Sequence, residues 1–137
     1  PEKVAFLEDL GAAQVLETGL KLGYSGGGSI SLDASQAIGE LVRFYTNEKG
    51  ADVVIDTVGT PLFNVSLNSL AQYGRIVCLG QVSSQNVSFN PAEMIFLDAH
   101  LFGCSGCSRS DVAYAINMVE HGQMKPVIHT DLPLKHW

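Results

Sequence analysis

The stretch that decides the fold is "ADVVIDTVG", residues 51–59. Val53, Val54 and Ile55 follow one another with no polar residue between them. A strand with one face exposed to solvent alternates apolar and polar residues. A strand that is buried on both faces of a parallel sheet has a continuous run of apolar residues instead. The stretch therefore predicts a buried parallel strand that closes in a turn at Gly59.

Working outward, buried strands alternate with amphipathic helices along the chain. The strands are expected at about residues 14–17, 52–56, 75–79 and 99–104. The helices are expected up to Gly11, at 33–47 with Asp33 or Ser35 as N-cap, at 62–72, and from a cap at Ser110 to Gly122. This alternation predicts an α/β fold with a doubly wound parallel sheet and helices on both faces.

Composition narrows the class of protein. The chain has 137 residues, a net charge of -6 and 46% hydrophobic residues, which indicates one globular domain. An acidic chain is a poor partner for nucleic acid or for an anionic membrane surface. No apolar run approaches the roughly 18 residues that cross a bilayer. Three cysteines are an odd number, so reduced thiols in the cytoplasm are expected.

The ends of three successive strands favour a ligand-binding edge. Doubly wound sheets bind ligands outside the carboxyl ends of their strands. Here the strands run into "DTVG", "CLGQ" and "FGCSG", each with a glycine that lets a ligand approach the backbone. A single glycine of this kind would be read as a turn residue, but three successive ones favour a common site.

Three longer segments resemble one family. They are "EKVAFLEDLGAAQVLETG", "KGADVVIDTVGTPLFNVSLNSLAQYGRIVCLGQ" and "SFNPAEMIFLDAHLFGCSG". Together they resemble the medium-chain, zinc-type alcohol dehydrogenase and quinone oxidoreductase superfamily. The resemblance implies a Rossmann-like domain that binds NAD or NADP. It also implies that residues 1–137 are a partial dinucleotide-binding domain, truncated at both ends, with the first strand, the glycine-rich turn and the catalytic domain absent.

The resemblance also implies which residues meet the cofactor, while the catalytic residues stay unknown. It places Lys3 by the adenosine ribose and the turn Thr57, Val58 and Gly59 against the adenine and its ribose. It places Leu79, Gly80 and Gln81 along the nicotinamide ribose, and main-chain groups of Cys104, Ser105 and Gly106 at the carboxamide. Gly80 is expected to be glycine because a side chain would displace the cofactor. Asp56 is expected to have a structural or capping role.

Two motifs allow other interpretations. Cys104 and Cys107 form a C-x-x-C pair, which could bind zinc or act as a redox pair. Cys78 lies in a buried strand and the four histidines are scattered, so no metal site is expected in this chain. Zinc remains possible in the missing domain. "GYSGGGS" at 23–29 lacks the Lys-Ser/Thr of a phosphate loop and is expected to be a flexible insertion.

The expected function is therefore part of an oxidoreductase. The parent protein would transfer a hydride between nicotinamide and a small-molecule carbonyl, alcohol or activated alkene. The alternative is a non-catalytic Rossmann-like module for binding or dimerisation. A homodimer is expected through the edge segments Asn86–Phe89 and Ala99–Gly103, which carry no Lys or Pro within "AHLFG" to block pairing. Residues 1–137 alone are expected to bind dinucleotide no more tightly than millimolar, because the phosphate-binding turn is missing.

Overall fold

The computed structural model describes residues 2–17, 31–128 and 130–133. The chain divides into two compact units, residues 1–104 and residues 105–137, and each is described by itself. The glycine-rich stretch 23–29 lies outside the described residues. None of the described helices is both long and apolar enough to span a bilayer.

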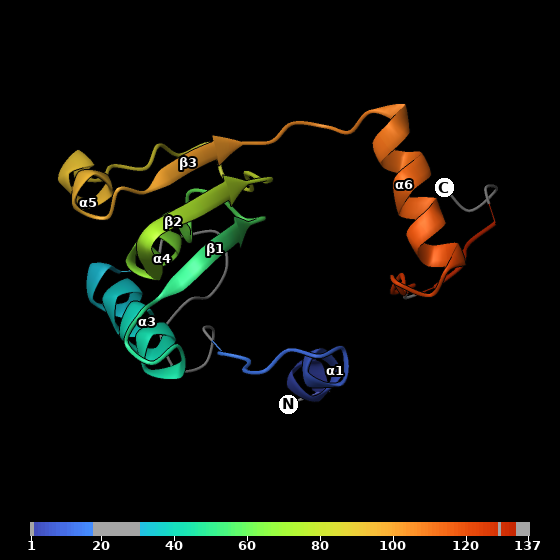
Figure 1. The fold of residues 1–137 in the computed structure, drawn as a ribbon, viewed down its shortest axis with the longest axis horizontal. Helices are drawn as coiled ribbons and strands as arrows, with labels where there is room; N and C mark the ends of the chain where they lie inside the picture. Colours follow the sequence, from blue (N-terminus) through green and yellow to red (C-terminus); the bar gives the residue numbers. More distant parts are fainter. Residues whose placement is uncertain (1, 18–30, 129, 134–137) are drawn as a thin grey trace. The chain divides into compact units, whose positions relative to one another are not determined.

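The first unit contains a three-stranded parallel sheet. Its order is β1 (Ala51–Asp56), β2 (Leu70–Cys78) and β3 (His100–Gly103). Both neighbouring pairs are parallel, and all three arrows point the same way (Figure 1). The Rossmann-like α/β fold and three of the four expected strands are therefore confirmed.

The expected strand at 14–17 is wrong, since these residues adopt no regular secondary structure. A strand must exchange backbone hydrogen bonds with a neighbour, and β1 pairs with β2 alone among the described residues. Val15 and Leu16 instead line an apolar hollow with Ile38, Leu41 and Tyr45 of the following helix. The sequence pattern alone does not distinguish a short apolar stretch beside a helix from a buried strand.

The described residues of the first unit form four helices. They are α1 (Glu2–Asp9), α3 (Leu32–Tyr45), α4 (Phe63–Asn68) and α5 (Pro91–Phe96). The α3 helix begins one residue earlier than expected, because Ser31 rather than Asp33 or Ser35 caps it and accepts from the Ala34 N–H. The helix expected at 62–72 ends at Asn68, because the chain from Leu70 onward joins the sheet as β2.

The hydrophobic core lies between α4 and one face of the sheet. Phe63 and Leu67 of α4 pack with Leu70 and Ile76 of β2, and Val54 of β1 packs against this cluster. Ile76 is 0% exposed. Because side chains alternate along a strand, the covered face takes every second residue of β1 and β2.

The opposite face of the sheet is exposed. It carries Val53, Ile55 and Phe102, of which Ile55 is 64% exposed, and Ile55 pairs with Val77, which pairs with Phe102. Helices on both faces were expected, and among the described residues this is confirmed for one face only. The continuous apolar run in β1 therefore places apolar side chains on both faces, although the described residues bury one.

Small residues bring α3 close to α4. A Cβ added at Gly39 would stand 2.5 Å from the carbonyl oxygen of Asn68, and the neighbouring Ser35 is fully buried. The Asn68 amide donates to the Ser35 hydroxyl at 3.1 Å. This contact holds α3 against the outer side of the helix that covers the core.

The second unit contains α6 (Arg109–Glu120), followed by Gly122 with φ +69°. Ser108, and not the expected Ser110, caps the helix. Its hydroxyl accepts from the Asp111 N–H at 3.2 Å, and the Asp111 carboxylate accepts from the Ser108 N–H at 2.8 Å. This reciprocal capping box satisfies two backbone donors at the start of a helix that has no buried residue.

Candidate functional site

The turns after β1 and β2 lie side by side at the carboxyl edge of the sheet. The Leu79 N–H donates to the Asp56 carbonyl at 2.8 Å, and the Val82 N–H donates to the Val58 carbonyl at 3.0 Å. The structure thus brings together residues 57–59 and 79–81, which sequence analysis assigned to one site. Thr57 and Leu79 are exposed at this edge.

Asp56 fixes the shape of the first turn. One carboxylate oxygen accepts from the backbone N–H groups of Val58 at 2.9 Å and Gly59 at 2.8 Å. The other accepts from the Ser66 hydroxyl of α4 at 2.9 Å. The expected structural role of Asp56 is confirmed, although the N-cap of α4 is Leu62. Every oxygen of this buried carboxylate is satisfied within the protein, as a buried charge requires.

The two glycines of these turns are required by the backbone itself. Gly59 has φ +80°, which a residue with a side chain rarely adopts, and a Cβ there would collide with the Gln81 carboxamide. A Cβ at Gly80 would collide with the carbonyl of Thr57. Gly80 was expected to be glycine in order to leave room for a cofactor. The structure shows a different and sufficient reason, the close approach of the two turns to each other.

The Gln81 side chain is committed to Thr60. Its carbonyl oxygen accepts from the Thr60 N–H at 2.8 Å, and its amide donates to the Thr60 hydroxyl at 2.6 Å. That hydroxyl in turn donates to the Gln85 carbonyl at 2.8 Å. Sequence analysis missed Thr60. The available signal was Gln81 itself, a polar side chain directly after the apolar stretch "IVCLG".

The end of β3 continues the same edge. The Cys104 N–H donates to the Cys78 carbonyl at 2.9 Å, so this main-chain N–H is already used by the sheet. Ser105 and Gly106 belong to the second unit, where Gly106 has φ +65° and open space around it. Lys3 is exposed on α1. The cofactor roles of these residues stay predictions.

The three cysteines are free and differ in their surroundings. Cys104 and Cys107 are exposed, whereas Cys78 is half-buried. Burial raises the pKa of the Cys78 thiol, and the negative charge of Asp56 raises it further. A raised pKa keeps Cys78 protonated at neutral pH and makes it a poor nucleophile or metal ligand.

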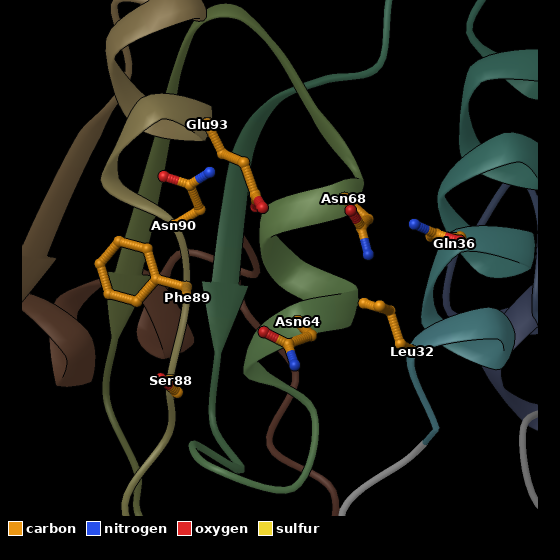
Figure 2. Close-up of a pocket in the computed structure, with 8 residues that line it drawn as sticks. All are labelled: Leu32, Gln36, Asn64, Asn68, Ser88, Phe89, Asn90 and Glu93. Carbon is orange, nitrogen blue, oxygen red and sulfur yellow. The ribbon is translucent and has the colours of Figure 1, made fainter.

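A separate pocket of about 450 Å³ lies away from these turns. Figure 2 shows α4, with Asn64 and Asn68, between side chains of α3 and the segment that leads into α5. The pocket is lined by Leu32, Gln36, Asn64, Asn68, Ser88, Phe89, Asn90 and Glu93. None of these residues was singled out as a ligand-binding residue from the sequence, and two of them already have partners, since Asn90 caps α5 and Asn68 binds Ser35.

Comparison with known proteins identifies the family. Residues 1–121 match the family described as zinc-binding dehydrogenase, so the chain belongs to it. Acryloyl-coenzyme A reductase of Metallosphaera sedula is 34% identical over 92 residues, which cover 66% of this chain and 28% of that enzyme. Quinone oxidoreductase of Pongo abelii is 27% identical over 100 residues, covering 69% of this chain and 30% of that protein. The chain thus spans less than a third of these curated relatives.

Solved structures agree with this assignment. D-arabinose dehydrogenase from Sulfolobus solfataricus is 26% identical with a TM-score of 0.72, covering 98% of this chain and 36% of that one. An NAD-dependent alcohol dehydrogenase is 25% identical with a TM-score of 0.73, covering 92% of this chain and 32% of that one. Both likenesses extend across nearly all of the chain.

The family description raises the question of zinc. Within residues 2–17, 31–128 and 130–133, no group of three or more His, Cys, Asp or Glu side chains is placed to hold a metal ion. Structural zinc sites use four ligands, and catalytic ones use three and keep an open position. The described residues therefore do not fit a zinc site.

Proposed function

We propose that this chain forms part of the nicotinamide dinucleotide-binding domain of an oxidoreductase. The observation that carries the proposal is the row of closely packed turns at the carboxyl ends of parallel strands, where Rossmann-like sheets bind nucleotides. The exposed side chains of Thr57 and Leu79 offer a ligand one polar and one apolar contact at this edge. The solved relative named as NAD-dependent supports the same cofactor class.

In this assignment the first turn holds the adenosine half of the cofactor and the second holds the nicotinamide half. Thr57, Val58 and Gly59 lie against the adenine and its ribose, with Lys3 reaching the ribose. Leu79 and Gly80 follow the nicotinamide ribose, and the main chain at Cys104, Ser105 and Gly106 binds the carboxamide. The residues of this chain bind and orient the cofactor, which supplies the hydride when bound.

The relatives named acryloyl-coenzyme A reductase favour an activated alkene as the substrate of the whole protein. In such a reduction the hydride adds to the β-carbon of an alkene conjugated to a carbonyl, and a proton adds to the α-carbon. Carbonyls and alcohols are the other substrate classes that the family suggests. The three free cysteines support a reducing, cytoplasmic setting.

Fluorescence titration with NADH and NADPH tests the proposal. The longest natural chain that contains residues 1–137 is expected to bind one of them at micromolar concentration. Residues 1–137 alone are expected to bind neither below millimolar, because pyrophosphate contacts at a helix N-terminus contribute much of dinucleotide recognition. Absence of binding by the longer chain would overturn the proposal. Micromolar binding by residues 1–137 would show instead that the site is complete without such contacts.

A second candidate function is a non-catalytic module that associates through its sheet. The edge of β3 that faces away from β2 has no strand partner among the described residues, and Leu101 and Phe102 of this strand are exposed. A second copy paired across a two-fold axis would satisfy the open backbone groups of both strands. A homodimer of this kind is also compatible with the oxidoreductase proposal.

Sedimentation analysis of a Leu101→Lys variant tests the dimer. A lysine on β3 is expected to weaken association, because pairing of two copies would place like charges on adjacent strands. Val87 in the neighbouring segment is a less suitable position, since it packs against the core cluster and its replacement would also disturb the fold. A wild-type chain that stays monomeric at high concentration would exclude the dimer for residues 1–137.

A further inference from the structure

We infer that Gln81 is a positioning residue, which binds Thr60 and so fixes the spacing between the two turns of the proposed cofactor site together with the backbone hydrogen bonds that join them. This inference rests on the proposed function and deepens it. It assigns Gln81 a role through Thr60 in place of direct contact with the cofactor, and it adds Thr60 to the site.

The geometry of the carboxamide supports this role. Both polar atoms of the Gln81 carboxamide bind Thr60. The oxygen accepts from the Thr60 N–H at 2.8 Å, and the nitrogen donates to the Thr60 hydroxyl at 2.6 Å. A carboxamide whose oxygen and nitrogen are both hydrogen-bonded in this way has a fixed orientation. Gln81 follows β2 and Thr60 follows β1, so the pair joins residues 21 positions apart in the sequence.

The hydroxyl of Thr60 extends the connection to the loop beyond the second turn. It donates to the Gln85 carbonyl at 2.8 Å while it accepts from Gln81. Thr60 is a buried polar residue at 8% exposure, so these bonds replace water that it cannot reach freely. These side-chain bonds to Gln81 and Gln85 add to the backbone bond from the Val82 N–H to the Val58 carbonyl, so several bonds join the turn after β1 to the segment 81–85.

The connection acts between the turns and leaves the shape of each turn to other groups. Asp56 fixes the first turn by accepting from the Val58 and Gly59 N–H groups. Loss of the two hydrogen bonds between Gln81 and Thr60 should therefore change the distance between the two turns more than the conformation of either turn. A ligand that spans both turns should lose affinity, and a ligand that occupies one turn should be affected much less.

The test uses the longest natural chain that contains residues 1–137, with substitution Gln81→Met. Methionine keeps the length of the side chain and removes both hydrogen bonds. The Kd for the preferred dinucleotide should rise about threefold to tenfold, as expected for the loss of one or two hydrogen bonds. The Kd for adenosine 5′-monophosphate, which occupies the first turn alone in the proposed assignment, should change by less than about twofold.

Gln72→Met is the matched control. It removes a side-chain hydrogen bond of the same kind, from the Gln72 amide to the Asp98 carboxylate at 3.1 Å, in the part of β2 remote from its carboxyl end. Both Kd values should stay at the wild-type level. Thr60→Val and Thr60→Ser form a second pair. Valine removes the hydroxyl and keeps the N–H that donates to Gln81, so it should give part of the Gln81→Met effect, while serine should retain wild-type binding. This pair carries the test if Gln81→Met does not fold.

The outcomes separate this inference from the function on which it rests. Wild-type protein that binds no dinucleotide overturns the proposed function. Wild-type protein that binds, with variants that bind equally well, overturns the positioning role and leaves the function standing. An equal loss of affinity for the dinucleotide and the monophosphate also overturns it, because a general weakening of the fold would account for both.

Discussion

The two faces of the sheet differ more than the sequence of their strands suggests. Val54 and Ile76 on one face pack against α4, while Val53 and Ile55 on the other face are exposed. All four side chains are apolar and β-branched, so the two faces are nearly equal in composition. The two faces differ in whether another element packs against them. The contribution of each side chain to the stability of the fold should therefore depend on whether its face is covered, and not on its hydrophobicity alone.

Alanine substitutions at the two isoleucines should give the largest effect and the most direct test. Ile76→Ala on the covered face should lower the free energy of unfolding by about 2–5 kcal/mol, because it leaves a cavity in the core. Ile55→Ala makes the same chemical change on the exposed face and should cost less than about 1 kcal/mol, the span of strand propensities. Urea denaturation measures both. Equal losses would mean that the face carrying Ile55 is covered in solution.

A second contrast lies at the carboxyl ends of the strands. Gly80→Ala should destabilise the chain by about 1–3 kcal/mol, the usual cost of overpacking, because the new methyl group meets the Thr57 carbonyl. Gly103 ends β3 and has no neighbouring atom within 4 Å of an added Cβ, so Gly103→Ala should be close to neutral. Thermal unfolding of the two variants compares them. A neutral Gly80→Ala would mean that the turns after β1 and β2 can move apart freely.

The reactivity of the Cys78 thiol tests whether the covered face of the sheet is protected from solvent. It should react with iodoacetamide more slowly than Cys104 and Cys107, because it is half-buried and its pKa is raised by burial and by Asp56. The folded state holds the thiol proton more tightly than the unfolded state does. Stability should therefore be constant below the ordinary thiol pKa of 9.0 and should fall as pH rises through the higher folded value.

Mass spectrometry of the labelled chain gives the order of reaction, and a Cys78→Ala variant is the control for the pH effect. The variant should lose the part of the alkaline instability that comes from this thiol. Labelling of Cys78 as fast as Cys104 would show that α4 does not protect this end of the covered face.

The smallest expected effect lies in the second unit, where α6 has no buried residue and depends on its local cap. Hydrogen bonds from the Ser108 side chain and backbone lower the pKa of Asp111. Helix stabilisation by the carboxylate should therefore be present above the ordinary carboxyl pKa of 3.8 and should be lost as pH falls through the lower folded value. Nuclear magnetic resonance titration of Asp111 measures this.

Ser108→Ala removes the hydroxyl partner and should raise the pKa of Asp111 toward its ordinary value. Ser110→Ala, at the residue first expected to be the cap, should have a smaller effect, because Ser110 makes contact only with the Ser108 hydroxyl in this group. Equal shifts in the two variants would contradict the capping box.

The sequence by itself determined the elements whose signals are local and continuous. The apolar runs of β1 and β2, together with the glycines that close them, indicated parallel strands meeting at one edge, and the segments quoted above indicated the family. Gly11 and Gly122 marked helix ends correctly, and both have positive φ. Such features depend on the residue and its immediate neighbours, so they can be predicted from the sequence without knowledge of the fold.

Tertiary structure alone decided how those elements meet. Val15 and Leu16 have an apolar pattern that fits a strand, but they line a hollow beside α3 and pair with no strand among the described residues. Leu70 and Ala71 fit a helix as well as a strand, and pairing with β1 made them part of β2. The hydrogen bonds between Gln81 and Thr60 could not be predicted from the sequence either. A hydrogen bond between residues far apart in the sequence depends on backbone positions that exist only once the sheet has formed.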